Sequence, residues 1–141
     1  MHVQQLYTKC LAHGAYYIES EGEAAIVDPL REPNAYLALL RERGAKLKYI
    51  FETHFHADFV SGHLDLQKMT GATIVYGPTA NPSFDCNVAS DGQLYNIGKL
   101  AIQVLHTPGH TMESSCFLLK DDSGKDKALF TGDTLFLGDV G

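Results

Sequence analysis

The sequence has no excess of basic residues and no long apolar run. Lys and Arg number 11 against 17 Asp and Glu, which gives a formal net charge of -6 at pH 7. Nucleic acids and anionic membranes are both polyanions, so this charge argues against either as a partner. No stretch reaches the about 18 apolar residues that a membrane-spanning helix needs. The first ten residues also lack the basic-then-apolar pattern of a secretory signal.

The sequence has few cysteines, and their spacing matches no known paired motif. Cys10, Cys86 and Cys116 are odd in number and form no C-x-x-C motif. Disulfides are rare in the cytosol, and a disulfide framework usually shows an even number of cysteines. We therefore predict reduced thiols in a cytoplasmic protein, each packing as a small hydrophobic side chain.

The 141 residues are enough for one domain with a substantial core, and we treat residues 1–141 as one domain. Short β-rich segments separated by Gly, Pro or polar turns dominate the pattern. The predicted strands are residues 14–20, 22–29, 46–54, 72–78, 93–98, 99–107, 114–122 and 127–133. Two helices are expected, over residues 33–44 and 62–71, and residues 79–92 are expected to form a surface loop.

Turn and cap residues sharpen these boundaries. Glu21-Gly22 suits a tight hairpin turn. Asn34 is a candidate N-cap of the first helix and Ser61 of the second, because their side chains can accept bonds from free backbone N–H groups. Gly44 is expected to end the first helix, as glycine tolerates the left-handed conformation at a C-cap. The pattern predicts an α/β sandwich of mixed sheets packed face to face, with helices outside.

Three predicted strands end abruptly in side chains that can bind a metal. The segments are "YIFETHFHAD", "IQVLHTPGH" and "ALFTGD". Their candidate ligands are the nitrogens of His54, His56 and His110 and the carboxylates of Asp58 and Asp133. Imidazole and carboxylate together suit zinc, iron or manganese. Composition alone would produce H-x-H-x-D by chance only about one time in forty, and three strand ends agree.

The remaining histidines have plainer interpretations. We interpret His2 and His13 as surface polar residues, and His63, at the start of a predicted helix, as structural. His106 precedes His110 by four residues, and we favour a buried hydrogen-bonding role for it over metal ligation.

The motifs "THFHAD", "HTPGHT" and "FTGDTLFLGDVG", in this order and spacing, resemble the metallo-β-lactamase superfamily over essentially the whole chain. The resemblance implies a metallo-β-lactamase-like αββα sandwich with a metal site at one edge of the two sheets. The superfamily contains hydrolases, nucleases, redox enzymes and oxygenases, so the fold alone does not name the reaction.

Phe59 indicates which branch of the superfamily the sequence resembles. Two-metal hydrolases of the superfamily, such as glyoxalase II, carry a histidine at the position of Phe59, and this histidine and the residue matching Asp58 hold the second metal. Phenylalanine has no lone pair to donate. The sequence therefore favours one metal ion per chain.

The one-metal pattern looks like the persulfide dioxygenases, and most closely like the rhodanese-fused bacterial type. The resemblance implies one Fe(II) per chain, held by His54, His110 and Asp133, with a low-molecular-weight thiol persulfide and dioxygen as substrates. Two histidines and one carboxylate form the facial triad of non-haem Fe(II) oxygenases. His56 and Asp58 are then expected to hydrogen-bond bound water or to be alternative ligands. No acid, base or nucleophile is assigned.

Two other functions remain open. One is a Zn(II)-dependent thioester hydrolase of the glyoxalase II type, and the other is a metal-binding module without catalysis. The family motif continues beyond Gly141, which predicts that the domain is truncated on its C-terminal side. Uncovered strands at that side would favour a homo-oligomer, or a fused or partner rhodanese domain.

Overall fold

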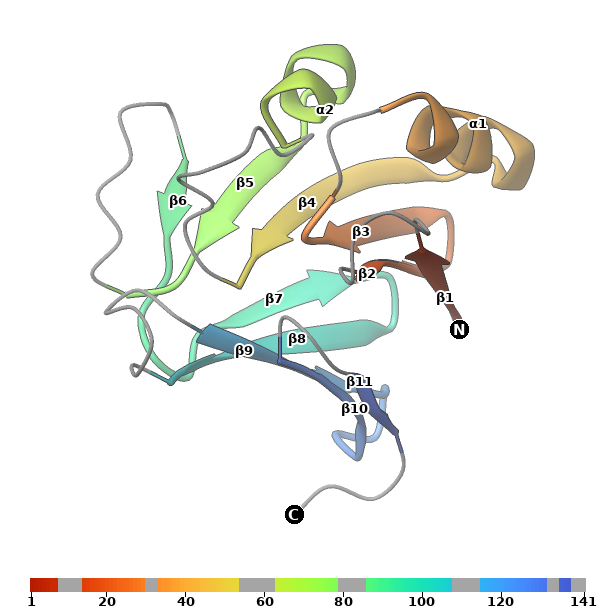
Figure 1. Ribbon diagram of the computed structural model, residues 1–141. Coiled ribbons are helices and arrows are strands. Elements are labelled where there is room, and N and C mark those ends of the chain that lie inside the picture. The colour runs from red at the N-terminus through yellow and green to blue at the C-terminus, as the bar shows by residue number, and fades with distance from the viewer. Residues whose placement is uncertain are drawn as a thin grey trace.

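The computed structural model describes residues 1–7, 14–29, 33–53, 63–78, 86–107, 115–131 and 135–137. These residues form two β-sheets packed face to face, with two helices on the outer side of the first sheet (Figure 1). The first sheet has the order β1 (His2–Tyr7), β2 (Gly14–Ser20), β3 (Glu23–Val27), β4 (Lys46–Glu52), β5 (Thr73–Tyr76) and β6 (Asn87–Val88). The second has the order β11 (Leu135–Leu137), β10 (Asp126–Phe130), β9 (Ser115–Lys120), β8 (Leu100–His106) and β7 (Leu94–Ile97). The helices are α1 (Asn34–Arg43) and α2 (His63–Thr70).

The first sheet is mixed, as predicted, whereas the second is antiparallel throughout its described pairs. Strands β3, β4 and β5 run parallel, with α1 and α2 in the connections between them. Crossovers between parallel strands are almost always right-handed, so successive helices of a sheet that grows in one direction cover the same face. Figure 1 shows α1 and α2 together on that face. Neither helix has the length and apolar character that crossing a membrane requires.

The central strands of the first sheet are buried on both faces. Along β3, Ala25 and Val27 face the second sheet, while Ala24 and Ile26 face the helices. This arrangement explains the nearly unbroken apolar run of β3, because both sets of alternating side chains are removed from water. Strand β8 instead alternates between buried and partly exposed residues. The second sheet therefore has one buried face.

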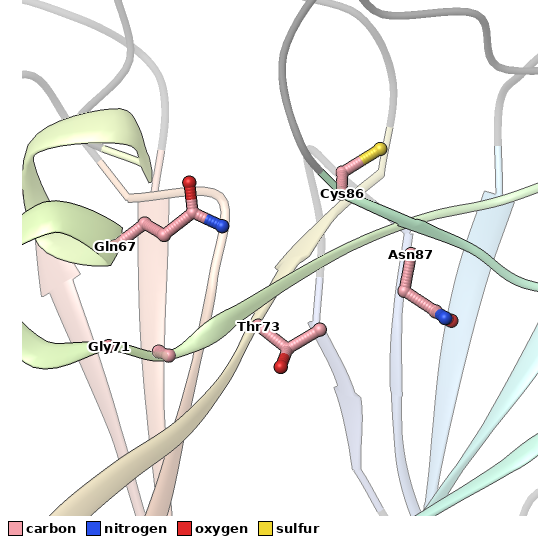
Figure 2. Close-up of a pocket in the computed structure, with 6 residues that line it drawn as sticks. Gln67, Gly71, Thr73, Cys86 and Asn87 are labelled. Carbon is pink, nitrogen blue, oxygen red and sulfur yellow. The ribbon is translucent and has the colours of Figure 1, made fainter.

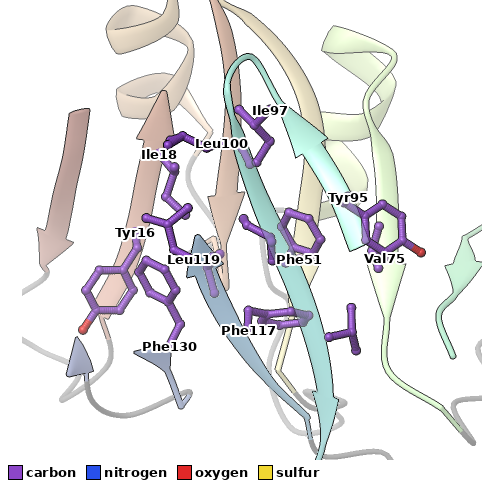
Figure 3. Packing of buried hydrophobic residues seen from close by; sticks show 14 of the residues in the cluster. Tyr16, Ile18, Phe51, Val75, Tyr95, Ile97, Leu100, Phe117, Leu119 and Phe130 are labelled. Atoms are coloured by element: carbon purple, nitrogen blue, oxygen red, sulfur yellow. The ribbon is translucent and has the colours of Figure 1, made fainter. Parts of the chain in front are cut away.

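The core between the sheets is rich in aromatic rings (Figure 3). The Phe51 ring lies 5.0 Å from the Phe117 ring and 5.6 Å from the Tyr95 ring, so it bridges the first sheet to two strands of the second. Tyr16 and Phe130 make a similar edge-to-face pair at 5.1 Å. Such pairs contribute about 0.5–1.5 kcal/mol each beyond the burial of their area.

A glycine joins the sheets at one end of the sandwich. Gly98, in the β7–β8 turn, has φ +56° and donates its N–H to a carboxylate oxygen of Glu23 at 2.7 Å. The next residue, Lys99, donates its N–H to the Ser20 hydroxyl at 3.2 Å. A Cβ atom at Gly98 would clash with the Ser20 carbonyl group, so the close approach of the two turns requires glycine. We call this end of the sandwich the turn end.

Several local predictions are confirmed. Glu21 and Gly22 form the β2–β3 turn with φ values of +52° and +78°. Gly44 ends α1 in the left-handed conformation, and its N–H bonds back to the Arg41 and Leu40 carbonyls. Cys86 and Cys116 are free thiols.

Other local predictions are wrong. Asn34 is the first helical residue rather than the N-cap, a position taken by Pro33 without a side-chain bond. The predicted loop over residues 79–92 contains β6, whose two residues pair with β5. Ser61 lies outside the described residues.

The outer face of the second sheet carries three partly exposed apolar residues, Leu105, Cys116 and Leu129. That another domain or a second copy of the chain covers this face stays a prediction.

Candidate functional site

The strands that lead into the three motifs meet at the end of the sandwich opposite the turn end. The Ser115 N–H, at the start of β9, donates to the carbonyl oxygen of Thr53, which follows β4, at 2.7 Å. His106, the last residue of β8, pairs with Ser115, and Phe130, the last residue of β10, pairs with Phe117. The chain therefore leaves β4, β8 and β10 toward its motifs from one small region. We call this region the motif end.

The predicted metal ligands themselves lie outside the described residues. They are His54, His56, Asp58, His110 and Asp133. Within the described ranges, no group of three His, Cys, Asp or Glu side chains is placed to hold a metal ion. Metal ligation by these five residues stays a prediction, which the placement of the three strand ends makes topologically feasible.

Asp28 is the buried polar residue on which the motif end is organised. It follows β3 and is only 1% exposed. Its Oδ1 accepts the backbone N–H of Thr53 at 2.8 Å, and its Oδ2 accepts the Thr53 hydroxyl at 2.6 Å. Its own N–H donates to the Phe51 carbonyl at 2.8 Å, which extends the β3–β4 pairing by one bond. The carboxylate thus binds both the backbone and the side chain of Thr53, the residue that directly precedes His54.

These contacts offset two costs. Burial removes the Asp28 carboxylate from water, and hydrogen bonds to a charged group typically contribute about 1.5–3 kcal/mol each. Asp28 also has φ +50°, in the left-handed region that non-glycine residues seldom adopt, although Asp tolerates it better than most. A strained conformation of this kind persists only where the surroundings fix it.

The electrostatic effect of Asp28 reaches a neighbouring strand. Burial, and secondly the negative charge of Asp28, raise the pKa of the Tyr16 hydroxyl above its ordinary value. Tyr16 therefore stays neutral at physiological pH. Its ring belongs to the core between the sheets, on the side of the first sheet that faces the motif-bearing strands.

Sequence reasoning missed the polar residues that support the motif end. The sequence pattern places Asp28 and Thr53 only within predicted strands, over residues 22–29 and 46–54. In the structure Glu52, Thr53 and Ser115 are all buried, at 0%, 2% and 2% exposure. A buried-strand pattern that ends in polar residues was the available signal, but their partners come from segments distant in sequence.

Three histidines fall among the described residues, and one of them, His63, begins α2. His106 is partly rather than fully buried, so the predicted burial is wrong; its backbone N–H donates to the Asp91 carboxylate at 2.9 Å. His2 is partly exposed and lies within hydrogen-bonding distance of the Gln4 side chain, at 3.1 Å, which fits its interpretation as a surface polar residue.

A hollow of about 440 Å³ lies elsewhere, between α2 and the first sheet's β6 edge (Figure 2). Its lining residues are Gln67, Gly71, Ala72, Thr73, Cys86 and Asn87. Thr73 begins β5, and β5 runs parallel to β4, so the hollow lies toward the opposite end of the strands from Thr53. It holds no histidine or carboxylate and has no part in the chemistry that the motifs predict.

Comparison with known proteins agrees with this architecture. The family model of the metallo-beta-lactamase superfamily matches residues 9–141. A metallo-beta-lactamase from Staphylococcus aureus subsp. aureus COL superposes with a TM-score of 0.83 at 32% identity, covering 93% of this chain and 42% of that one. ETHE1 from Myxococcus xanthus superposes with a TM-score of 0.76 at 32% identity, covering 84% of this chain and 54% of that one.

Among curated proteins, a cytoplasmic hydroxyacylglutathione hydrolase from Arabidopsis thaliana is 33% identical over 140 residues, which is 96% of this chain and 54% of the relative. The chain spans about half the length of the curated relatives that it matches. The match of the family model over nearly all residues, together with the two-sheet architecture, shows that the chain belongs to the metallo-beta-lactamase superfamily.

Proposed function

We propose that the chain carries the metal site of a persulfide dioxygenase, at the motif end of the sandwich. The observation that carries this proposal is the hydrogen bond between Ser115 and Thr53, which brings the start of the first motif beside the strands that lead into the other two. In the proposal His54, His110 and Asp133 hold one metal ion. Each ligand then follows a different strand end of the same region.

The donor set fits Fe(II). Two imidazoles and one carboxylate would hold the ion and leave it able to bind both a substrate and dioxygen. When bound, the iron supplies the electron transfer that activates dioxygen toward sulfur. Phe59, outside the described residues, stands where the two-metal hydrolases that the sequence resembles have a histidine, so one ion per chain is proposed. His56 and Asp58 would hydrogen-bond water or substrate beside it.

The proposed overall reaction is balanced as R-S-S⁻ + O₂ + H₂O → R-SH + SO₃²⁻ + H⁺. The terminal sulfur is oxidised, dioxygen is reduced by four electrons, and the S–S bond breaks as water releases sulfite. The role of the described residues is to hold the three motif segments together and to keep water from the adjoining core. Asp28, Thr53 and Ser115 join the start of the first motif to β9, the pairing of β10 with β9 brings the third motif beside them, and the aromatic core beneath excludes water.

The comparisons support two finer functions. The ETHE1 neighbour, at 32% identity, fits the persulfide dioxygenase branch. The hydroxyacylglutathione hydrolases, at 32–38% identity, favour a second candidate, a Zn(II)-dependent thioester hydrolase of the glyoxalase II type. In that candidate the same motif residues would hold zinc, which would supply activation of water for hydrolysis of the thioester.

Metal content separates the two candidates. The chain is purified without added metal and analysed for iron and zinc, and oxygen uptake is measured with glutathione persulfide. One iron per chain and oxygen uptake that is lost in His54→Ala support the dioxygenase. Two zinc ions per chain, with hydrolysis of a hydroxyacylglutathione and no oxygen uptake, would overturn it in favour of the hydrolase.

The chain spans about half the length of its relatives, so we expect these 141 residues alone to turn over the persulfide only weakly. Metal content is therefore the primary readout. The proposed partners are a small-molecule thiol persulfide and dioxygen, with a fused or separate rhodanese domain as the source of persulfide sulfur. A second copy of the chain is the proposed cover of the second sheet's outer face.

A further inference from the structure

We propose that the hydroxyl group of Tyr16 donates a hydrogen bond to a sulfur oxyanion, such as sulfite, bound at the motif end. The inference rests on the proposed function, because it names a further contact between the same site and the product of that reaction. Tyr16 is the third residue of β2 and is only 3% exposed. Its role is to hold an oxygen of the oxidised sulfur and not the metal ion.

Tyr16 lies at the motif end of the core between the sheets. It pairs with Val27, the last residue of β3. Its ring lies 5.1 Å from the ring of Phe130, the last residue of β10, and Asp133 follows three residues later in the sequence. Figure 3 shows the Tyr16 hydroxyl pointing away from Ile97, which lies near the turn end. The hydroxyl therefore faces the end of the sandwich from which the motifs leave.

Packing alone does not explain a tyrosine at this position. The same core contains three buried phenylalanines, and a phenyl ring would fill the place of Tyr16 without burying a polar atom. Buried tyrosine hydroxyls usually find a hydrogen-bond partner. The Tyr17 hydroxyl donates to Glu19 at 2.8 Å. The Tyr95 hydroxyl donates to the side chain of Asn87. Among the residues that the structure describes, none forms such a bond with the Tyr16 hydroxyl, which leaves it available to a ligand.

The electrostatics at Tyr16 favour a neutral donor. Burial, and secondly the negative charge of Asp28, raise the pKa of the hydroxyl, so it keeps its proton at physiological pH. A hydrogen bond from a neutral donor to a charged oxygen is roughly twice as strong as one between neutral groups, whereas sulfur accepts only weakly. The Tyr16 hydroxyl therefore stabilises the oxidised sulfur more than the persulfide, which is the direction that favours the reaction.

Two substitutions in adjacent residues isolate the hydroxyl. Tyr16→Phe deletes only the oxygen and keeps the ring against Phe130. Tyr17→Phe is the matched control, because it deletes a buried hydroxyl from the next residue of the same strand. Side chains alternate along β2, so Tyr17 belongs to the core under the helices, on the opposite face of the sheet from Tyr16.

The first measurement is the Kd of the Zn²⁺-loaded full chain for sulfite, by titration calorimetry under nitrogen. Tyr16→Phe should weaken sulfite binding by at least about tenfold, and Tyr17→Phe should stay within about twofold of the parent chain. Ethanethiol, which binds through sulfur and has no oxygen, should bind the parent and Tyr16→Phe equally. Equal sulfite Kd values for the parent and Tyr16→Phe overturn the proposal. A parallel loss of ethanethiol affinity also overturns it, because that is the result of a general disturbance of the site.

The second measurement follows Tyr16 directly and separates this inference from the proposed function. In a chain with ¹³C-labelled tyrosine rings, sulfite should shift the NMR resonance of Tyr16 and leave that of Tyr17 in place, and the titration is run with and without Zn²⁺. A Tyr16 resonance that sulfite moves in neither form overturns the inference, even where iron content and oxygen uptake support the dioxygenase. A chain with two zinc ions and no oxygen uptake, but with sulfite binding that depends on Tyr16, overturns the dioxygenase and supports the oxyanion contact.

Discussion

The two ends of the sandwich join the same two sheets by different means. At the turn end, the contacts are Gly98 against Ser20 and Glu23, with Lys48 donating to the Asn96 carbonyl at 3.1 Å near the surface. At the motif end, the Ser115 N–H joins the sheets by donating to the Thr53 carbonyl, and buried hydrogen bonds to the Asp28 carboxylate hold Thr53 within the first sheet. The turn end is thus closed by backbone bonds and exposed charged groups, whereas the motif end uses buried polar groups with defined partners.

The two ends differ because they contain different kinds of chain segment. Hairpin turns cluster at the turn end, and they need only conformational freedom and exposed polar bonds. The motif end instead collects carboxyl ends of parallel strands, which place functional segments side by side in many α/β folds. The cost is a buried carboxylate and a strained backbone at Asp28. Substitutions at the two ends should therefore affect different properties.

The largest expected effect is the loss of metal retention by substitutions at the motif end. Asp133→Ala should abolish metal retention, because it removes the carboxylate of the proposed triad and leaves two neutral imidazoles. His56→Ala should weaken binding by roughly tenfold to a hundredfold. Elemental analysis after gel filtration measures both. If His56→Ala empties the site and Asp133→Ala leaves it full, a site of histidines replaces the proposed triad.

The next effect is on stability, in the core that both ends share. Phe51 is fully buried and contacts rings of Phe117 and Tyr95 across the sheets. Phe51→Ala should lower the free energy of unfolding by about 3–5 kcal/mol, measured by urea denaturation. Ile97→Val, near the turn end of the same core, should cost about 0.5–1.5 kcal/mol. Similar losses from both variants would contradict the bridging role of Phe51.

A smaller loss is expected at the turn end itself. Gly98→Ala forces a Cβ into the Ser20 carbonyl at φ +56°, and should cost about 2–3 kcal/mol. Gly22→Ala is the matched control, since φ is +78° there and no atom lies within 4 Å; it should cost about 1–2 kcal/mol. Metal affinity per folded molecule should be unchanged in both. A tenfold weaker Kd in Gly98→Ala would remove the distinction between the ends.

The smallest effect is electrostatic and belongs to the β9–β10 hairpin, also at the turn end. The Ser123 hydroxyl, with backbone N–H groups of the turn, lowers the pKa of Asp121 from 3.8 to about 2. The ionised form is thus favoured in the folded state. Its contribution is fully present above about pH 4 and is lost as pH falls toward 2.

Asp121→Asn should therefore flatten the dependence of the unfolding free energy on pH between about pH 4 and 2. Asp122→Asn is the matched control for loss of one charge in the same turn. An Asp121→Asn profile as steep as that of the parent chain would show that the turn bonds do not stabilise the carboxylate.

Elements with local signals were predictable from the sequence. The β2–β3 hairpin follows from Glu21-Gly22 between two apolar runs, and the end of α1 from Gly44. Strand β6 was missed because its two residues have no periodicity, and it exists only through pairing with β5. Strand β11, of three residues, was missed for the same reason.

The candidate site was predictable only in part. The metal-capable side chains after three strands were visible in the motifs, and the topology brings those strand ends together. The polar residues that hold these strand ends together could not be identified from the sequence. Asp28 and Thr53 are 25 residues apart, and Thr53 meets Ser115 only when the sheets pack. Neither contact leaves a periodic or compositional signal in the chain.

Each sheet is built from one continuous stretch of sequence, residues 2–88 for the first and 94–137 for the second. Synthesis on the ribosome therefore completes the first sheet before its covering layer exists. At about 5–20 residues per second, the second sheet follows roughly 2–10 s later. During that interval the inner face with Tyr16, Ile18, Phe51 and Val75 has no partner layer. Until the second sheet forms, this apolar face of the nascent chain is exposed to water.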